Sequence, residues 1–424
     1  MAATCCSVDL GEKLFCSLNQ AFIVDPEIDE IDIIPCMHCQ EEHNDEKEDP
    51  FIIVSHKLGI KSWCIKPLFL FAYNKLIRSR IKGKKDCNLS VTESVQLSRA
   101  VLLVNAECYT AWNARKEMIT SGVLNLVDDW KFSGVVLSKH PRSAETFSHR
   151  KWTIVQLEKH KGQGEFIQSY LRTELAITLR AAECYADNYT AWSHRAWLVD
   201  RFMYDKKKKL FCELQGIRAW AESHISDNCC FHHRQLLLRH LKNVCSKGEV
   251  VHLLLSEVEF ITDLILTFPG HEVLWYHRRF VYHISNHWFP DVGPQTVREI
   301  ANGPERNGDC NTDNINRTTR RTSPSIIPSL LELASSSFKI LTESKSRSRL
   351  KTPITDGTFL PLSASSEFKF CDGVIAECKG PEGVVQRSCA LNYKRWLLIR
   401  STPHQLNCNG AAFTPKVVTE AGLS

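Results

Sequence analysis

The sequence lacks the features by which membrane and secreted proteins are usually recognised. No apolar run approaches the roughly 20 residues needed to span a bilayer, and the opening MAATCCSVDLGEKLF has neither a basic leader nor the apolar core of a signal peptide. Ala2 rather than Gly follows the first Met, and the final AGLS contains no Cys, so neither end carries a lipidation signal. We expect a soluble, cytoplasmic protein without a transmembrane segment.

The sequence also lacks a charge excess and a cysteine framework. Its 53 basic and 48 acidic side chains leave +5, so no nucleic-acid partner is expected. The 18 cysteines have no framework spacing and indicate reduced, buried thiols. Cys36 and Cys39, with His43 nearby, have no second half at zinc spacing, so we expect no metal in this chain. Without a phosphate loop, nucleophile elbow or zinc-hydrolase motif, no catalytic residue is predicted.

What the sequence does contain is a repeat in which an aromatic residue is followed three positions later by Arg. The five copies are Trp112 and Arg115, Phe147 and Arg150, Trp192 and Arg195, Phe231 and Arg234, and Trp275 and Arg278. The aromatic residues lie 35, 45, 39 and 44 positions apart, a period typical of helix–turn–helix units with variable loops. Breakers such as HPRSAET and FPGHE lie before the aromatic residues, so each copy is predicted to be the second helix of an αα-hairpin.

The repeated residues are predicted to be structural. Positions i and i+3 share a helix face, so the aromatic side chain should fill the core between hairpins and the Arg should lie beside it. A buried Arg needs acceptors, and we expect carbonyl or carboxylate groups of an adjoining repeat. A His precedes four of the Arg residues, at His149, His194, His233 and His277. The recurrence of this His in successive repeats favours a packing role over a catalytic or metal-binding one, because a catalytic or metal site normally occurs once in a repeat array.

The remaining segments differ from the repeats. Residues 1–90 are predicted to form an N-terminal capping region, with helix on both sides of Pro67. Ser, Thr, Pro, Gly, Asn and Arg dominate the segment after the fifth hairpin, which indicates a low-complexity, largely disordered insert. The predicted boundaries are 1–90 for the cap, 91–285 for five αα-hairpins, 286–387 for the insert, 388–400 for a degenerate sixth repeat and 401–424 for a C-terminal tail.

The repeated aromatic-x-x-Arg frame, which extends over residues 93–283, resembles the α subunits of protein prenyltransferases. A tetratricopeptide array fits less well, because its W-x-x-L-G-x-x-Y signature and fixed period of 34 are absent. The segments DPEIDEIDIIPC, VEFITDLILTFPGHEVLWYHRR and YKRWL narrow the resemblance to the α subunit of the third type of geranylgeranyltransferase. It implies an all-α fold, a right-handed superhelix of αα-hairpin repeats of the prenyltransferase α type, broadly similar to tetratricopeptide arrays.

The resemblance also implies functional positions, all close to hairpin turns. The family places a Lys that reaches the isoprenoid diphosphate five residues before the second aromatic residue, where this sequence has Arg142. Tyr189 matches a Tyr that lines the substrate interface, whereas its counterpart one repeat earlier is Ala144. Glu145 replaces a Gln that binds the C-terminal carboxylate of a CaaX peptide, and like charges would repel there. The alternative to a functional role for Arg142 is that of a solvated turn residue. The alternative for Tyr189 is that of a residue that packs within its hairpin.

The function implied is that of an α subunit in a heterodimeric protein geranylgeranyltransferase. The chain would scaffold a zinc-bearing β subunit, expected to be the Rab-type one, and dock protein substrates with C-terminal cysteines. Geranylgeranyl diphosphate would be the lipid donor, and this chain alone would bind no cofactor and be inactive. The alternative is a non-enzymatic helical-repeat adaptor in membrane traffic, which the departures at Arg142 and Ala144 leave open.

Overall fold

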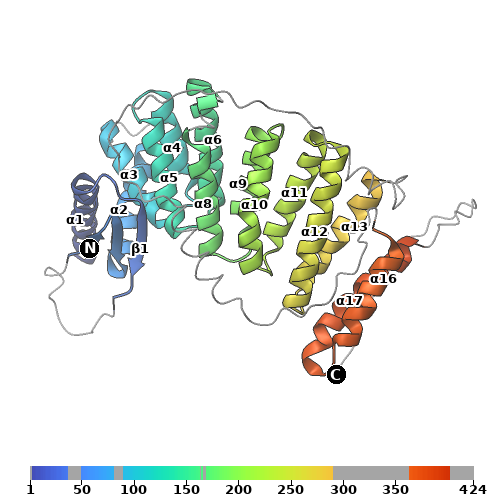
Figure 1. Cartoon of the computed structure of the whole chain (residues 1–424). Helices are drawn as coiled ribbons and strands as arrows, with labels where there is room; N and C mark the ends of the chain where they lie inside the picture. The colour runs from blue at the N-terminus through green and yellow to red at the C-terminus, as the bar shows by residue number, and fades with distance from the viewer. Residues whose placement is uncertain are drawn as a thin grey trace, which may run out of the picture. The chain divides into compact units, whose positions relative to one another are not determined.

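The computed structural model describes residues 2–36, 49–80, 89–162, 164–165, 169–289 and 362–401. The chain divides into two compact units, Met1–Ser246 with Asp263–His277 and Lys247–Thr262 with Arg278–Ser424. The division falls within the two helices of one hairpin. Figure 1 shows the elements coloured along the chain.

Six αα-hairpins occur in the described parts of the chain. They are α3 (Val91–Val104) with α4 (Tyr109–Thr120), α5 (Leu126–Lys139) with α6 (Ala144–Lys161), α8 (Leu171–Cys184) with α9 (Tyr189–Phe202), α10 (Lys207–Ser223) with α11 (Asn228–Val244), α12 (Lys247–Thr267) with α13 (Glu272–Trp288), and α16 (Ala364–Glu377) with α17 (Val384–Ser401). In the first five, four residues join the two helices. The predicted all-α helical-repeat class is confirmed.

The short turns stop one helix and cap the next. The Ser143 hydroxyl accepts a hydrogen bond from the Thr146 amide, and the Asn188 side chain accepts one from the Ala191 amide. The Asp227 carboxylate accepts from the amides of both Cys229 and Cys230. Each cap satisfies donors that a helix leaves unpaired in its first turn, so the polar turns fix where the second helices begin.

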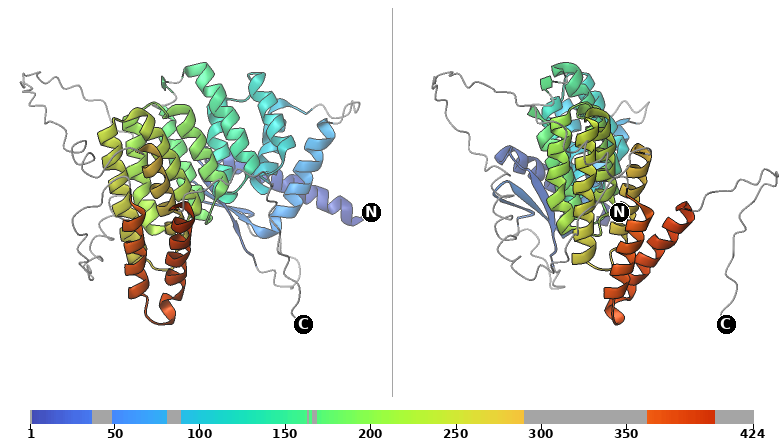
Figure 2. Two further views of the ribbon diagram at one scale, coloured as in Figure 1. Left: turned by 90° about the vertical axis from the view of Figure 1, so that its right-hand side faces the viewer. Right: turned by 45° about the vertical axis from the view of Figure 1, so that its right-hand side comes forward.

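The hairpins of the first unit stack in two layers, which the two views of Figure 2 show. Along one layer α3 contacts α5 and α5 contacts α8, and along the other α4 contacts α6, α6 contacts α9 and α9 contacts α11. Apolar side chains fill the space between the layers. Examples that are fully or almost fully buried are Leu103, Trp112, Val136, Ile154 and Leu198.

The N-terminal region combines two helices with a small sheet. Helix α1 (Ala2–Val24) packs on α2 (Ile65–Arg80), which packs on α3. Strands β1 (Glu30–Ile34), β2 (Phe51–Val54) and β3 (Lys57–Lys61) form a sheet in the order β1-β3-β2. β1 runs parallel to β3, and β2 antiparallel. β1 lies on α5, where the Ile31 amide donates to the Ser138 hydroxyl at 2.9 Å.

The structure differs from two expectations drawn from the sequence. Helix was expected on both sides of Pro67, but β3 and a short 3-10 turn at Ser62–Cys64 come before α2. Pro67 lies in the first turn of α2, where its missing N–H removes no helical hydrogen bond. A helix can therefore begin just before this proline without extending further back.

The second correction concerns the predicted insert, 286–387. Its last part forms α16 and the first turn of α17, so the sixth hairpin is longer than the predicted 388–400. The Ser363 hydroxyl caps α16 by accepting from the Ser366 amide, and Cys371 and Val374 are buried. Residues 290–361 of the insert and 402–424 of the tail lie outside the described residues.

The sequence predicts neither a transmembrane segment nor disulfide bonds. Within the described ranges, no helix combines the length and apolarity that crossing a bilayer requires. The cysteines described there are free thiols. Cys64, Cys108, Cys230, Cys371 and Cys389 are buried, whereas Cys16, Cys184 and Cys212 are exposed, so the expectation that the thiols are buried is only partly correct. Cys39 and His43, considered above as zinc ligands, lie outside the described residues.

Candidate functional site

The repeated aromatic residues are buried and contact the His of the next hairpin. The Trp112 ring stacks on the imidazole of His149, with centroids 4.3 Å apart. The corresponding centroid distances are 5.1 Å for Phe147 and His194, 5.4 Å for Trp192 and His233, and 5.3 Å for Phe231 and His277. One aromatic–imidazole contact thus recurs at successive interfaces between hairpins of the first unit.

The repeated Arg residues join their own hairpin to the next one. Arg195 Nη1 donates to the Leu175 carbonyl at 2.6 Å and the Thr178 hydroxyl at 2.9 Å, both on the first helix of its hairpin. Its Nε and Nη2 donate to the two carboxylate oxygens of Glu213, on α10, at 2.6 and 2.9 Å. This two-pronged geometry is the strongest form of an Arg–carboxylate pair. The Glu213 carboxylate is an acceptor from an adjoining repeat, as the sequence predicts, whereas the Leu175 carbonyl and the Thr178 hydroxyl belong to the hairpin of Arg195 itself.

Two other Arg residues of the first unit repeat this arrangement. Arg115 Nε donates to Asp129 Oδ1 at 2.5 Å. Arg150 donates to Glu174, and its Nη1 also donates to the Trp130 carbonyl at 2.9 Å and the Ser133 hydroxyl at 2.7 Å. All of these side chains are less than a tenth exposed. Because a buried charge needs a partner, each pair ties two hairpins together.

The repeated His residues complete each cluster. His149 Nε2 lies 2.5 Å from Asp129 Oδ2, and the equivalent Nε2 atoms of His194 and His233 lie 3.0 Å from Glu174 and Glu213. The Nδ1 atoms of these three imidazoles are buried and have no hydrogen-bond partner among the described residues. Since an ionised carboxylate only accepts, Nε2 carries the proton. We call each set of Arg, carboxylate and His an inter-hairpin bridge.

The charge states of the bridges follow from their burial. Desolvation by burial lowers the pKa of His149, His194 and His233 below 6.5, although the carboxylate opposes this, so the imidazoles are neutral. Burial alone would raise the pKa of Glu174 and Glu213, but the Arg charge and the His hydrogen bond outweigh it and lower both to about 2. Each bridge is therefore an Arg–carboxylate ion pair supported by a neutral imidazole.

The second unit contains a variant of the bridge. Arg278 Nε and Nη2 donate to Glu367 at 2.7 and 2.9 Å, and Nη1 donates to the Thr262 hydroxyl at 2.7 Å. The third member is Tyr393, whose hydroxyl donates to Glu367 Oε2 at 2.8 Å. Tyr393 thus takes the position that His occupies in the first unit. Lys394, in the position of the Arg, forms an ion pair with Asp372 at the surface.

Sequence reasoning missed the carboxylates of the bridges, although a signal for them exists. Asp129, Glu174 and Glu213 each lie 20 positions before the His that they bind. Glu257, which is also buried, lies at the same spacing before His277. A search for acidic residues at a fixed distance from the repeated His would have found all four.

The three residues implied by the family resemblance lie along one edge of the hairpins. Arg142 lies in the turn between α5 and α6, Glu145 in the first turn of α6, and Tyr189 is the first residue of α9. We call this side, where the four-residue turns lie, the turn edge. No hydrogen bond or ion pair joins the three to one another among the described residues, so they share an edge and do not form a cluster.

Their surroundings differ. Arg142 is exposed, its Nη1 donates to the Tyr185 hydroxyl at 2.8 Å, and its guanidinium lies 4.3 Å from the centre of that ring. Tyr185, which sequence reasoning missed, thus links Arg142, in the turn between α5 and α6, to the next turn, between α8 and α9. Tyr189 is 76% exposed. Glu145 is half-buried at a helix N-terminus, where a carboxylate is favoured whatever its function.

Shallow hollows lie between successive turns. One of about 360 Å³ is lined by Asn105, Glu107, His140, Arg142 and Tyr185, among others. A second of about 240 Å³ lies between the next two turns and is lined by Asp187, Trp220, His224 and Asp227. Both are open to solvent. The turn edge therefore offers surface recesses and not an enclosed active site.

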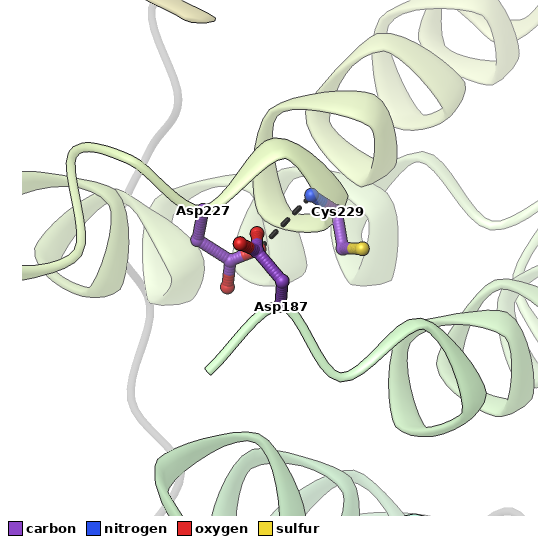
Figure 3. Close-up of side chains that lie close together, drawn as sticks. All are labelled: Asp187, Asp227 and Cys229. Carbon is purple, nitrogen blue, oxygen red and sulfur yellow. Dashed lines mark hydrogen bonds between the residues drawn. The ribbon is translucent and has the colours of Figure 1, made fainter. Parts of the chain in front are cut away.

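Three side chains beside the second hollow have the spacing of metal ligands. Figure 3 shows Asp187, Asp227 and Cys229, whose ligand atoms all lie within 4.8 Å of one another. The Asp227 carboxylate, however, already accepts from the amides of Cys229 and Cys230 and from the indoles of Trp192 and Trp220. Burial and the two carboxylates raise the pKa of Cys229 to about 11, so the thiol is protonated. These contacts explain the cluster as a cap for α11.

The stacked hairpins and the inter-hairpin bridges together define a helical-repeat protein. The family model "Protein prenyltransferase alpha subunit repeat" matches residues 171–202, 210–241 and 254–284. The first match coincides with α8 and α9, and the others fall on the next two hairpins.

Relatives extend the match over nearly the whole chain. The human protein prenyltransferase alpha subunit repeat-containing protein 1 is 30% identical over 438 residues, which cover 92% of this chain and 97% of the relative. The zebrafish (Danio rerio) protein of the same name is 33% identical over 320 residues, 66% of this chain and 73% of the relative. The chain belongs to the family of protein prenyltransferase alpha subunit repeat-containing proteins. The alpha subunit of geranylgeranyl transferase type-2 from Saccharomyces cerevisiae is 21% identical over 214 residues, 49% of this chain and 63% of the relative.

Proposed function

We propose that this chain is the α subunit of a heterodimeric protein geranylgeranyltransferase. Its partner would be a zinc-bearing β subunit of the Rab type, and the complex would transfer the lipid of geranylgeranyl diphosphate to a C-terminal cysteine of a protein substrate. The observation that carries the proposal is the turn edge, which presents Arg142, Glu145 and Tyr189 along one side of consecutive hairpins. The similarity to a geranylgeranyl transferase subunit supports the choice of lipid.

Arg142 is suited to binding a diphosphate. Its guanidinium is exposed and is held from one side by the hydroxyl and the ring of Tyr185. A planar guanidinium can donate two parallel hydrogen bonds to phosphate oxygens, and it remains charged at any physiological pH. It would neutralise charge on the leaving diphosphate but could not donate a proton to it, as a Lys could.

Glu145 bears on the choice of protein substrate. A Gln at this position could donate a hydrogen bond to a C-terminal carboxylate, whereas a carboxylate there repels it, and more strongly in the half-buried position observed. We infer that short CaaX peptides bind poorly and that the protein substrate is held through a larger surface. Exposed Tyr189, one hairpin further along the turn edge, would contribute to that surface.

The zinc belongs to the proposed partner, where it would lower the pKa of the substrate thiol and so supply the thiolate nucleophile. The residues of this chain would hold charge and position the substrate. Asp187, Asp227 and Cys229 do not suit that zinc, because the Asp227 carboxylate already accepts hydrogen bonds from two backbone amides and from the indoles of Trp192 and Trp220.

Purification of the chain together with its cellular partners tests the proposal. The full chain is purified from cells with an affinity tag, and the complex is assayed for a zinc-bearing β subunit and for geranylgeranyl transfer to cellular proteins. Arg142→Glu should slow transfer, whereas Arg172→Glu, which changes another exposed Arg, on α8, should not. Absence of both a β subunit and transfer would refute the proposal and favour the adaptor. Equal turnover of the two variants would refute the role of Arg142.

A further inference from the structure

The outward face of the last hairpin is unusual for the end of a helical-repeat array. Terminal repeats normally present a polar outer face, because no further repeat covers it. Helix α17 instead exposes aliphatic side chains along its whole length. They are Val384, Val385, Leu391, Leu398 and Ile399, of which Val384, Leu398 and Ile399 are 61%, 53% and 69% exposed.

These side chains lie on one side of the helix. Val384, Leu391 and Leu398 follow one another in steps of seven, which return to the same face of an α-helix. Cys389, Ala390, Tyr393 and Leu397 lie on the opposite side and are buried. There α17 packs on α16, and through Trp396 it reaches Tyr282 of α13. The exposed stripe is therefore separate from the side that holds the hairpin together.

The charge on the exposed stripe has one sign. Arg387 and Arg395 are exposed on it, Arg400 is exposed at its end, and α17 contains no Asp or Glu. Arg387 and Arg395 form no ion pair among the described residues. A second copy of this face would bring like charges together, which disfavours self-association through α17. An anionic surface that can also accept aliphatic side chains is the complementary partner.

The geometry points to α17 as a docking element for an anionic lipid membrane. The helix would lie flat on the bilayer, with its aliphatic side chains inserted among the acyl chains nearest the surface and its arginines at the lipid phosphates. This role goes beyond the proposed transferase function, since it places the chain at the kind of surface where a lipid-modified protein resides. It does not require the chain to take part in transfer.

Vesicle flotation with the purified full chain tests the inference. Vesicles of phosphatidylcholine are compared with vesicles that also contain phosphatidylserine. We expect at least ten-fold stronger partitioning to the anionic vesicles, and a loss of at least ten-fold in the double variant Leu398→Ser/Arg395→Glu. The matched control is Leu266→Ser/Arg172→Glu, which changes an exposed Leu and an exposed Arg outside α17 and alters the net charge equally. Circular dichroism checks that both variants remain folded.

Three results would overturn the inference. The first is that the chain partitions no better to anionic than to neutral vesicles, which would leave an acidic protein surface as the partner of α17. The second is that both double variants lose binding equally, which would place the contact elsewhere, for example at Lys206–Lys209. The third is that the α17 variant abolishes a dimer detected by light scattering without changing flotation. None of these outcomes depends on transfer activity, so the proposed function is tested separately.

Discussion

Replacement of Arg195 by Ala should destabilise the array far more than the loss of an ordinary surface charge. The guanidinium makes four hydrogen bonds, two to Glu213, one to the Leu175 carbonyl and one to the Thr178 hydroxyl. Without it, the Glu213 carboxylate stays buried with His233 alone. Breaking a buried ion pair by removing one partner costs about 3–5 kcal/mol. For a domain of this size that corresponds to a fall in Tm of roughly 6–20 °C.

Thermal unfolding followed by circular dichroism measures this effect. The matched control is Arg201→Ala on the same helix, because Arg201 pairs with Glu158 nearer the surface, and such pairs contribute about 0–1 kcal/mol. If Arg195→Ala and Arg201→Ala lower the Tm equally, or neither lowers it, the bridge does not stabilise the array.

A double variant separates the lost charge pair from lost packing. Glu213→Gln keeps an oxygen that can accept from His233 but removes the carboxylate charge. We therefore expect Arg195→Ala/Glu213→Gln to be more stable than the sum of the two single changes predicts, by about 0.5–3 kcal/mol. Strict additivity would mean that the cost of Arg195→Ala arises from the cavity and not from the unpaired carboxylate.

Two further predictions concern pH and the second unit. The lowered pKa of the three bridge imidazoles means that the unfolded chain binds more protons below pH 6.5, so stability should fall as the pH drops through that value. Glu174 and Glu213, with a pKa of about 2 against 4.5 when unfolded, should extend the loss below pH 4.5. A Tm that stays constant from pH 7 to 4.5 would contradict the imidazole assignment, and one that stays constant from pH 4.5 to 2 would contradict the carboxylate assignment. Tyr393→Phe removes a hydrogen-bond donor to Glu367 and should lower the free energy of unfolding, measured in urea, by about 1.5–3 kcal/mol. The control Leu391→Ala, on the exposed side of α17, should lower it less. Equal losses in the two variants would argue against the Tyr393–Glu367 hydrogen bond.

The repeated hairpins could be predicted from the sequence because their strongest signal is local. An aromatic residue and an Arg three positions apart occupy one helix face, and polar turns precede them. The carboxylates that bind Arg150 and Arg195 have no such local signal, because Glu174 and Glu213 look like ordinary charged residues of a surface helix, and only their spacing of 20 positions from the repeated His marks them. Their burial depends on a neighbouring hairpin that lies well away in sequence.

The expectations that the structure corrects also failed because the deciding contacts have no local signal in the sequence. The three strands of the N-terminal region are four or five residues long, too short for a clear alternating pattern, and β3 runs directly into the turn before α2. The sequence places α16 in the insert because its Ser-rich start resembles the preceding segment, whereas the burial of α16 is provided by α17. For the turn edge, the resemblance indicated Arg142 but not Tyr185, since a contact between two turns has no local signature.

The bridges also give the array a direction and two distinct ends. The first hairpin supplies Arg115 to the Asp129 carboxylate of the second, but it has Ala114 where the next four hairpins have His. The sixth has Glu367 to receive the Arg278 cation, but Lys394 ends at the surface. An internal hairpin could therefore be duplicated with its charges still matched, whereas an end hairpin moved inward would leave a carboxylate or a guanidinium without its counterion. The charges thus determine which hairpins can stand at the two ends of the array, whereas they leave the number of internal hairpins open.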